Sequence, residues 1–442
     1  ESTIISGRGF HRTIIDGGAI SRVFNVTSRS GDVTFNDLTI DNGEVGGEQL
    51  NETVGAGIRF ESTGTLSFVN TVVSNNKNRS ASASATGGGI FANLGTVTIV
   101  NSTISGNSAK SGGGVYAGAA LNVTNSTFHN NSAEIGGAIF AKATTTITNS
   151  TISTNTASEE AGAIKSSGSL TLTHSTVVGN RSIEFIGGID AANLTVLSSI
   201  LADNTDPRGT TNLRRSPQSI RFSIVDNQQG TTLPVSPVSQ PDRDGNVVFT
   251  PDANGNFIGS PTRSVDPKIG ELEFNGGTTM THDLLPGSLA INAGDPATAT
   301  TPATDQRGLP FVRRSGRLDM GAVESQELDP SMFVVTTMND ELDFSNSLVS
   351  LREAITLANS ESNVDNITFA TSVTTPINLT LGALKISNPV NITGRSTAPV
   401  AIDAGQKSRV FEIEESAGDV TLSLVTIRNG KTTLGDQDGG GI

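Results

Sequence analysis

The sequence predicts an all-β chain that folds as a right-handed parallel β-helix, a solenoid of stacked coils. One observation is an Asn that recurs at near-regular spacing, at positions 107, 131, 155, 180 and 204. A second is a Gly motif between these Asn residues, as in Gly87-Gly-Gly-Ile90 and Gly136-Gly-Ala-Ile139. A third is the aromatic content of 4% with no Trp, which suits thin aliphatic layers better than one globular core.

Each coil of about 24 residues is expected to contain three short strands separated by corners. Runs such as Thr-x-Thr and Val-x-Val point every second side chain inward. Gly at the corners permits positive φ. Coils stack at about 4.8 Å, so Asn side chains in one column can bond to each other. The predicted structural ladder is Asn42, Asn76, Asn107, Asn131, Asn155, Asn180 and Asn204, and a second column is Asn36, Asn70, Asn101, Asn125, Asn149, His174 and Ser198.

A longer repeat joins the two ends of the chain. Ile15-Asp-Gly-Gly18 returns as Ile402-Asp-Ala-Gly405, and Arg22-Val-Phe24 returns as Arg409-Val-Phe411. Gly31-Asp-Val-Thr34 also returns, at positions 418–421, and every pair has the same offset in the numbering. We therefore expect the chain to be a fragment of a tandem array, with one unit and the start of the next.

Residues 266–326 carry a different pattern, which includes Asn275-Gly-Gly277, His282, Ala290-Ile-Asn-Ala-Gly294 and Asp305-Gln-Arg-Gly308. This region resembles the C-terminal choice-of-anchor Q region of bacterial β-helix proteins. The resemblance implies the terminal part of a β-helix unit in an exported protein.

Residues 331–360 combine Val334-Val-Thr-Thr337 with Ser350-Leu-Arg-Glu-Ala-Ile355, and resemble the CSLREA domain that precedes β-helices in exported bacterial proteins. The Cys of the family motif is Val349 here, so no thiol role carries over. Ser350 and Glu353 form a capping box, which predicts a short capping helix near 350–359.

These features divide the chain into four predicted regions. Residues 1–265 form a β-helix with an irregular loop at 205–265, and 266–326 form the terminal region. Residues 331–360 form the cap of the next unit, and 361–442 begin a second β-helix. The coil with Phe128-His-Asn-Asn131 also resembles the repeats of chlamydial polymorphic outer membrane proteins.

The predicted fold is pectin-lyase-like, and many such helices are polysaccharide lyases or hydrolases. The sequence, however, offers no cluster of three or more carboxylates with a Lys or Arg on one β-sheet face. Glu159 and Glu160 are expected in a solvated corner, and His174 in a structural stack. Arg214, Arg215 and Arg221 are expected in a solvated loop, with an anionic glycan as the alternative. We assign no catalytic and no cofactor-binding residue.

Two Asp- and Asn-rich segments resemble the first half of a calcium loop, and calcium is the single candidate cofactor. Their residues are Asp242, Asp244 and Asn246, followed by Asp252, Asn254 and Asn256. The Glu expected at the twelfth position is replaced by Ala253 and Arg263. Turn chemistry alone explains both segments, so no metal site is assigned.

The net charge of −14 disfavours a nucleic-acid partner, and no apolar run is long enough to span a bilayer. The chain has no Cys, which excludes disulfides and thiol chemistry. We expect a non-enzymatic exported protein at the cell surface or outer membrane, a structural stalk or adhesin-like array. Cell-surface or matrix glycans or proteins are its expected partners. A polysaccharide lyase, hydrolase or glycan-binding β-helix is the alternative.

Overall fold

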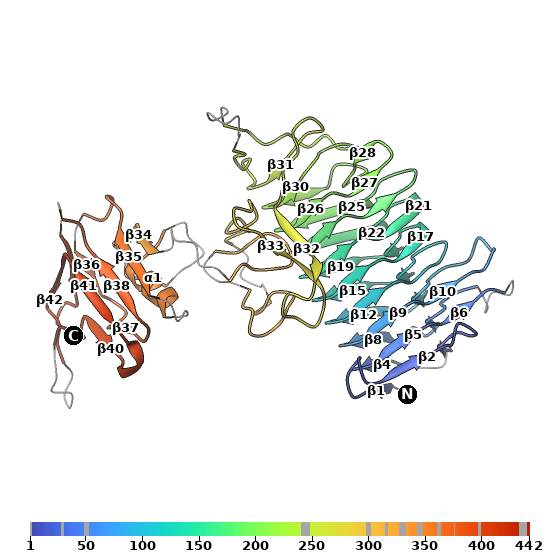
Figure 1. Ribbon diagram of the computed structural model, residues 1–442, viewed down its shortest axis with the longest axis horizontal. Coiled ribbons are helices and arrows are strands. Elements are labelled where there is room, and N and C mark those ends of the chain that lie inside the picture. The colour runs from blue at the N-terminus through green and yellow to red at the C-terminus, as the bar shows by residue number, and fades with distance from the viewer. Residues whose placement is uncertain are drawn as a thin grey trace. The chain divides into compact units, whose positions relative to one another are not determined.

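The computed structural model describes residues 2–27, 31–47, 53–239, 248–297, 302–313, 317–326, 333–342, 348–359, 364–374, 376–396, 399–432 and 440–442. The chain divides near residue 326 into two compact units, which are described separately below. In both units, neighbouring coils pair through parallel strands (Figure 1).

The largest sheet of the first unit has two columns of parallel strands, which alternate inward and outward side chains. One column holds β1 (Thr3–Ser6), β4 (Val33–Asn36), β8 (Thr65–Val69), β12 (Thr96–Val100), β15 (Leu121–Thr124) and β19 (Thr145–Thr148). The other holds β3 (Phe24–Val26), β7 (Ile58–Phe60), β11 (Ile90–Ala92), β14 (Val115–Ala117) and β18 (Ile139–Ala141). The long strands β22 (Ile164–Thr173) and β25 (Ile189–Leu197) join the columns, and β29 (Ser219–Arg221) follows β25.

Two further sheets complete the coils. The second sheet holds β2 (Ile14–Asp16), β5 (Thr39–Asp41), β9 (Val72–Ser74), β13 (Thr103–Ser105), β16 (Thr127–His129), β20 (Thr151–Ser153), β23 (Thr176–Val178), β26 (Ile200–Ala202), β30 (Ile224–Val225) and β31 (Phe257–Ile258). Shorter strands form the third side: β6 (Glu44–Val45), β10 (Lys77–Asn78), β17 (Ser132–Ile135), β21 (Thr156–Glu160), β24 (Arg181–Ser182), β27 (Thr205–Asp206) and β28 (Gly209–Thr210).

The core is a set of stacked columns that are mostly aliphatic, with Phe in some coils. In the second sheet, Ile104, Phe128, Ile152 and Val177 occupy the same register position in successive coils and are fully buried. Like side chains one coil apart lie in contact, so each coil completes the burial of the one before. The predicted parallel β-helix is confirmed. The segment predicted as an irregular loop contains β29, β30 and β31, which continue two of the sheets.

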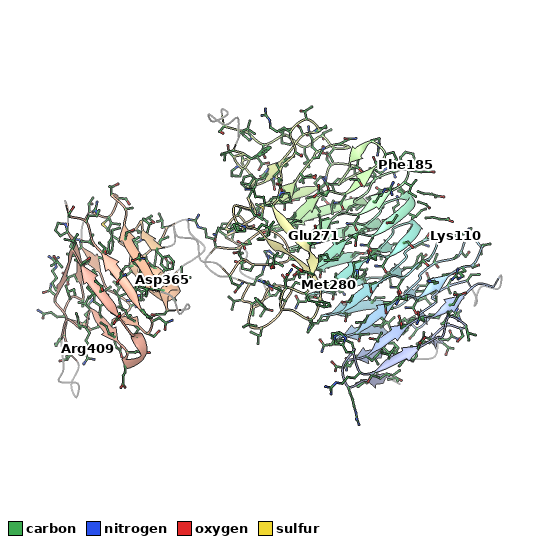
Figure 2. The ribbon with its side chains drawn as sticks, viewed as in Figure 1. Lys110, Phe185, Glu271, Met280, Asp365 and Arg409 are labelled. Carbon is green, nitrogen blue, oxygen red and sulfur yellow. The ribbon has the colours of Figure 1, made fainter. Side chains whose placement is uncertain are left out.

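The described residues of 266–313 and 318–325 belong to the first unit, and they pack on the outer face of the second sheet. They contain an antiparallel hairpin of β32 (Ile269–Glu273) and β33 (Thr281–Leu284), marked by Glu271 and Met280 in Figure 2. The hydroxyl of Thr127 donates to the Met280 carbonyl at 2.6 Å, and the amide N–H of Ala322 donates to the Thr176 hydroxyl at 3.0 Å. Outward Thr side chains of the second sheet thus bind the terminal region to the β-helix.

The second unit repeats the strand pattern of the first behind a helical cap. Its elements are β34 (Val334–Val335), α1 (Leu351–Ala358), β35 (Asp365–Phe369), β36 (Ile377–Asn378), β37 (Leu384–Ile386), β38 (Val390–Thr393), β39 (Val400–Asp403), β40 (Phe411–Ile413), the 3₁₀ turn η3 (Glu415–Ala417), β41 (Val420–Ser423) and β42 (Val425–Arg428). Helix α1 begins at the predicted capping box: the Ser350 hydroxyl accepts the Glu353 amide N–H, and the Glu353 carboxylate accepts the Ser350 N–H.

Candidate functional site

An asparagine ladder runs through the interior of the first unit. Nδ2 of Asn131 donates to Oδ1 of Asn155 at 2.9 Å, and Nδ2 of Asn155 donates to Oδ1 of Asn180 at 2.9 Å. The same contact links Asn76, Asn107, Asn131, Asn155, Asn180 and Asn204, all of which are buried. Each Nδ2 also donates to a carbonyl of the preceding coil, such as Phe128 O from Asn155 at 3.0 Å. The ladder therefore satisfies corner groups that burial would otherwise leave unpaired.

The ladder differs from the prediction at both ends. The register that pairs Asp41 with Ser74 aligns Gly43, and not Asn42, with Asn76. The Gly43 amide N–H donates to Oδ1 of Asn76 at 2.8 Å, while Asn42 adopts the left-handed corner conformation with φ 52°. At the other end, Nδ2 of Asn204 donates to Oδ1 of Asn212 at 2.9 Å. Asn212 lies outside the regular Asn spacing, which therefore gave no signal for it.

The second predicted column marks left-handed corners of the coils. Asn70, Asn101, Asn125, Asn149, His174 and Ser198 have φ between 45° and 55°, which Asn adopts more readily than most residues. The prediction of Asn36 for this column is wrong, because Asp37 takes the corresponding position with φ 54°.

A serine ladder, which the sequence did not predict, lies directly after this corner. The Ser102 amide N–H donates to the Ser126 hydroxyl, and the Ser126 N–H to the Ser150 hydroxyl, both at 3.1 Å.

We expect His174→Asn to raise the free energy of unfolding by about 1 kcal/mol. The His174 ring is buried, and within the described ranges neither ring nitrogen has a hydrogen-bond partner. Burial, with the charge of Arg313, lowers the pKa of His174 to about 2, so the ring is neutral. An amide at 174 would face Asn149, whose Oδ1 also has no partner there, and would extend the Asn125–Asn149 contact.

Urea denaturation would measure this change. His174→Ala removes the ring without supplying an amide and is the control that should lose stability. Loss of stability in both variants would show that packing of the ring outweighs its unpaired nitrogens.

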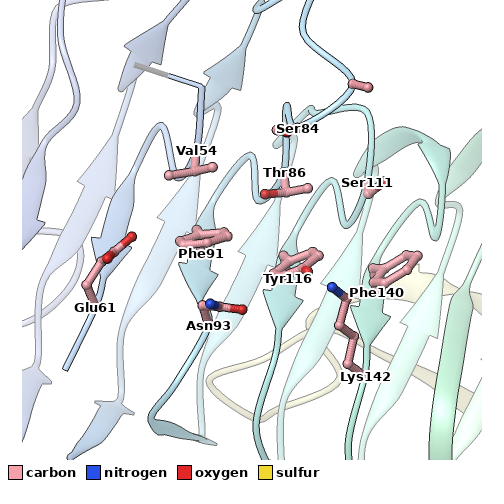
Figure 3. Close-up of a pocket in the computed structure, with 11 residues that line it drawn as sticks. Val54, Glu61, Ser84, Thr86, Phe91, Asn93, Ser111, Tyr116, Phe140 and Lys142 are labelled. Carbon is pink, nitrogen blue, oxygen red and sulfur yellow. The ribbon is translucent and has the colours of Figure 1, made fainter. Parts of the chain in front are cut away.

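A groove on the outer face of the largest sheet is the strongest candidate for a ligand site. Its floor is a stack of Phe91, Tyr116 and Phe140, each at the middle of a three-residue strand whose flanking residues point inward. Ring centroids lie 5.2 and 5.4 Å apart, with interplanar angles of 17° and 7°. Val54, Thr86 and Ser111 line one side, and Glu61, Asn93 and Lys142 line the other (Figure 3). The groove has a volume of about 460 Å³, within the range of small-molecule sites.

Lys142 supplies a cation to this groove, with Nζ 5.3 Å from the centroid of the Tyr116 ring. Glu61 on the same side is paired with Arg59 at 2.9 Å. Phe91 and Tyr116 are only 7% and 6% exposed, because each ring stacks on the next. The groove therefore offers an apolar floor between polar side chains, which is the composition of a binding site. Tyr116 is the single Tyr of the chain, and only the parallel register, which no local pattern indicates, aligns it with two Phe residues.

Beyond Phe140 the same outward column continues as Lys165 and Asp190. Asp190 is nearly buried and holds Arg215 at 3.0 Å and Arg214 at 2.9 Å, besides Lys165. Glu160 accepts from Lys165 at 2.9 Å and is also bonded to Arg214. The solvated corner predicted for Glu160 is therefore wrong, because its side chain is paired and largely covered. Arg214 and Arg215 lie in an exposed loop, as predicted, but their guanidinium groups are ion-paired there. Glu159 is exposed, as expected for the opposite strand face.

This ion cluster of Glu160, Lys165, Asp190, Arg214 and Arg215 brings two carboxylates together, as acid–base chemistry on a sugar requires. All four of their oxygens, however, are occupied by cations. A general acid or base needs an oxygen within reach of the substrate proton. The cluster thus continues the outward column beyond Phe140 as paired charge, and no carboxylate oxygen in it is left for a substrate proton.

The calcium hypothesis concerns two Asp- and Asn-rich segments. Asp242, Asp244 and Asn246 lie outside the described residues. The Asp252 carboxylate accepts the amide N–H groups of Asn254 and Asn256 at 2.8 and 2.9 Å, and Asn256 Oδ1 accepts the Ser223 N–H at 3.1 Å. The Asp252 oxygen thus stabilises its own turn, and the Asn256 oxygen accepts the last N–H of the serine ladder. Nowhere in the part of the chain that the structure describes do three His, Cys, Asp or Glu side chains gather as metal ligands would.

His282 pairs with Ser153, a combination that can form a nucleophile and its base. Nε2 lies 2.9 Å from the Ser153 hydroxyl, and Nδ1 lies 2.7 Å from the Gly270 carbonyl. The ring is thus oriented by a backbone carbonyl, and both side chains are buried beneath the terminal region. Burial lowers the pKa of His282. The pair therefore joins the β32–β33 hairpin to strand β20 of the β-helix.

Asp226 makes the stability of the first unit depend on pH. Burial raises its pKa to about 6 from the ordinary value of 3.8, so the folded state binds the proton more tightly than the unfolded state. Its contribution to stability is therefore full below about pH 4 and is lost as the pH rises through about 6. We expect urea midpoints of the wild type, relative to Asp226→Asn, to fall across this window. Parallel curves for the two proteins would contradict this, and Asp16→Asn, at the exposed last residue of β2, is the control.

Comparison with protein-family models, with curated proteins and with solved structures finds no match to this chain. Within the described ranges, no helix has the length and apolar character needed to cross a membrane.

Proposed function

We propose that this chain is part of an exported surface array in which β-helix units act as a stalk or adhesin-like spacer. The observation that carries the proposal is the recurrence of whole strands at one sequence offset: β38, β40 and β41 begin at Val390, Phe411 and Val420, and β1, β3 and β4 begin at Thr3, Phe24 and Val33. A sequence that restarts the same architecture is organised as repeated units. The likeness of 266–326 and 331–360 to regions of exported bacterial β-helix proteins supports export to the cell surface.

The ladders suit a load-bearing role. Every coil from Asn76 to Asn204 is joined to the next by side-chain bonds inside the helix as well as by parallel strands. Local opening of one coil would break both sets of bonds together, which favours cooperative, rigid behaviour. The ion cluster, with its carboxylates occupied, supports a non-enzymatic interpretation.

Two measurements test this proposal. The chain is incubated with plant and algal polysaccharides, with and without calcium, and new reducing ends and unsaturated-sugar absorbance are followed. We expect neither signal, and release of either would contradict the non-enzymatic interpretation in favour of a lyase or hydrolase. Beads coated with the chain are then passed over cell layers and matrix proteins. Retention above that of beads coated with an unrelated protein of equal charge supports adhesion.

The groove favours a second candidate function, the binding of a glycan segment. Its support is the apolar floor between Asn93 and Lys142 on one side and Thr86 and Ser111 on the other. Tyr116→Ala and Phe140→Ala should each weaken retention on a glycan array by roughly tenfold, as for other buried aromatic contacts. Phe185→Ala, which alters an aromatic that is 54% exposed outside the groove, is the matched control. Equal retention of all variants would contradict a role for the groove.

A further inference from the structure

The first coil of the first unit has an open edge. Among the described residues, β1 pairs only with β4, β2 only with β5 and β3 only with β7. The equivalent strands of the second unit, β38, β39 and β40, pair on the opposite side with β35, β36 and β37. The same strands thus occur once with a preceding coil and once without it.

Burial follows this difference at matched positions. Ile392, Ile402 and Phe411 are fully buried. Their counterparts in the first coil, Ile5, Ile15 and Phe24, are only partly buried against the core. The inward side chains of the first coil are therefore the same residue types, with one layer of contact fewer. Ile4 and Ile14 on the same strands are 69% and 58% exposed, and an apolar open edge promotes association.

The second unit shows what covers such an edge. Strands β35–β37 supply a coil whose Ile367, Leu384 and Ile386 face inward. Helix α1 lays its buried Leu351, Ala354 and Ile355 over this coil. Arg352 anchors the helix by donating to the Gly382 and Ala383 carbonyls at 2.7 and 3.1 Å. The cover is therefore an aliphatic coil and an amphipathic helix held to it by one cation.

We propose that β1–β3 form a docking surface for a second copy of the segment 333–389, which adds a parallel coil and its helix to the first unit. This surface is equivalent to the face of β38–β40 that pairs with β35–β37 in the second unit. Because Val390 corresponds to Thr3, this segment would run directly into Thr3. This proposal uses the same strand equivalence as the proposed array and goes beyond it by naming the cover of the first coil. Exchange at β1–β3 tests this cover, whereas retention on cells and matrix proteins tests the surface role, so the two outcomes are distinguishable.

The test is a protein in which a copy of residues 333–389 is placed directly before Thr3 of the full chain. Hydrogen exchange is followed at β1–β3 by mass spectrometry. In the second unit the Glu414 amide N–H donates to the Ile386 carbonyl at 2.9 Å, and its counterpart is Thr27. We expect exchange at β1–β3 and at Thr27 to slow by roughly tenfold or more, as for strands that gain an inner position. Unchanged exchange there would overturn the proposal.

The matched control carries Ile367→Asp and Ile386→Asp in the added copy only, which places charges at two fully buried positions. It should leave exchange at β1–β3 as in the unmodified chain. Equal slowing by both prefixes would show a nonspecific effect and overturn the proposal. The same two substitutions in the native segment should speed exchange at β38–β40, and they show whether this coil protects its neighbour where it is known to lie.

Discussion

Replacing Asn155 with Ala is expected to lower the free energy of unfolding of the first unit by about 3 kcal/mol. The side chain accepts the amide N–H and the Nδ2 of Asn131 at 3.0 and 2.9 Å. It also donates to Oδ1 of Asn180 and to the Phe128 carbonyl. Truncation removes the acceptor of the Asn131 amide N–H, and an unpaired buried group costs about 1–3 kcal/mol. Asn131 Nδ2 keeps the Ile104 carbonyl and Asn180 Oδ1 keeps the backbone N–H of residue 155, so each loses one of two bonds. The small cavity adds to the loss.

Asn122→Ala is the matched control, because Asn122 points outward from β15 and is exposed. Its effect should stay within about 0.5 kcal/mol. Urea denaturation gives both values, and hydrogen exchange at the corners of neighbouring coils shows whether the loss is local. Equal effects of the two substitutions would mean that the ladder contributes nothing beyond an ordinary surface Asn.

The fold was predictable because its signals are periodic. The Asn step, the Gly motif and the alternation of Thr and Val all express one coil repeated in register, so each coil confirms the next. Errors arose where the period breaks. The longer first coils hid the shift that places Gly43 opposite Asn76, and Asn212 completes the ladder from an irregular coil. The serine ladder was present in every Asn-Ser-Thr motif, but Ser is common at turns and gave no distinct signal.

The candidate site was predictable only in part, because it depends on which outward residues the register aligns. Phe91, Tyr116 and Phe140 belong to successive coils, and each looks like an isolated aromatic in its own strand. The ion cluster joins Glu160 to Arg214, two positions far apart in the sequence and beyond the reach of local pattern. Asp190 directly follows a Gly motif, and the matched positions in the two preceding coils hold Lys165 and Phe140 instead of a carboxylate. Inward periodicity predicts a core, whereas outward side chains carry no such repeat.

Asp190→Asn is expected to destabilise the first unit by about 2–4 kcal/mol. The carboxylate is 2% exposed and is bonded to Lys165, Arg214 and Arg215. The substitution leaves three cations around one neutral amide, with Glu160 as the single remaining carboxylate of the cluster. Arg214 and Arg215 are about half exposed, so solvent screens part of the repulsion and the loss stays below that of a fully buried ion.

Controls make this prediction specific to the buried charge. Glu134→Gln breaks an exposed pair with Lys110 at 3.8 Å and should change stability by less than about 0.5 kcal/mol. Adding Lys165→Met to Asp190→Asn should restore part of the loss, because it removes one uncompensated cation while keeping the apolar stem. No recovery in this double variant would mean that the hydrogen bonds of Asp190, and not its charge, hold the cluster.

The Asp190→Asn variant also tests whether this carboxylate is structural or catalytic. Removing a catalytic group usually abolishes activity while leaving stability unchanged or higher, because active sites hold groups in unfavourable arrangements. Removing a group that neutralises its neighbours lowers stability first. A stable Asp190→Asn protein would therefore favour the enzymatic alternative and make Asp190 and Glu160 the residues to test on polysaccharides. A destabilised one identifies the Asp190 carboxylate as a structural group that neutralises Lys165, Arg214 and Arg215, and supports the non-enzymatic interpretation.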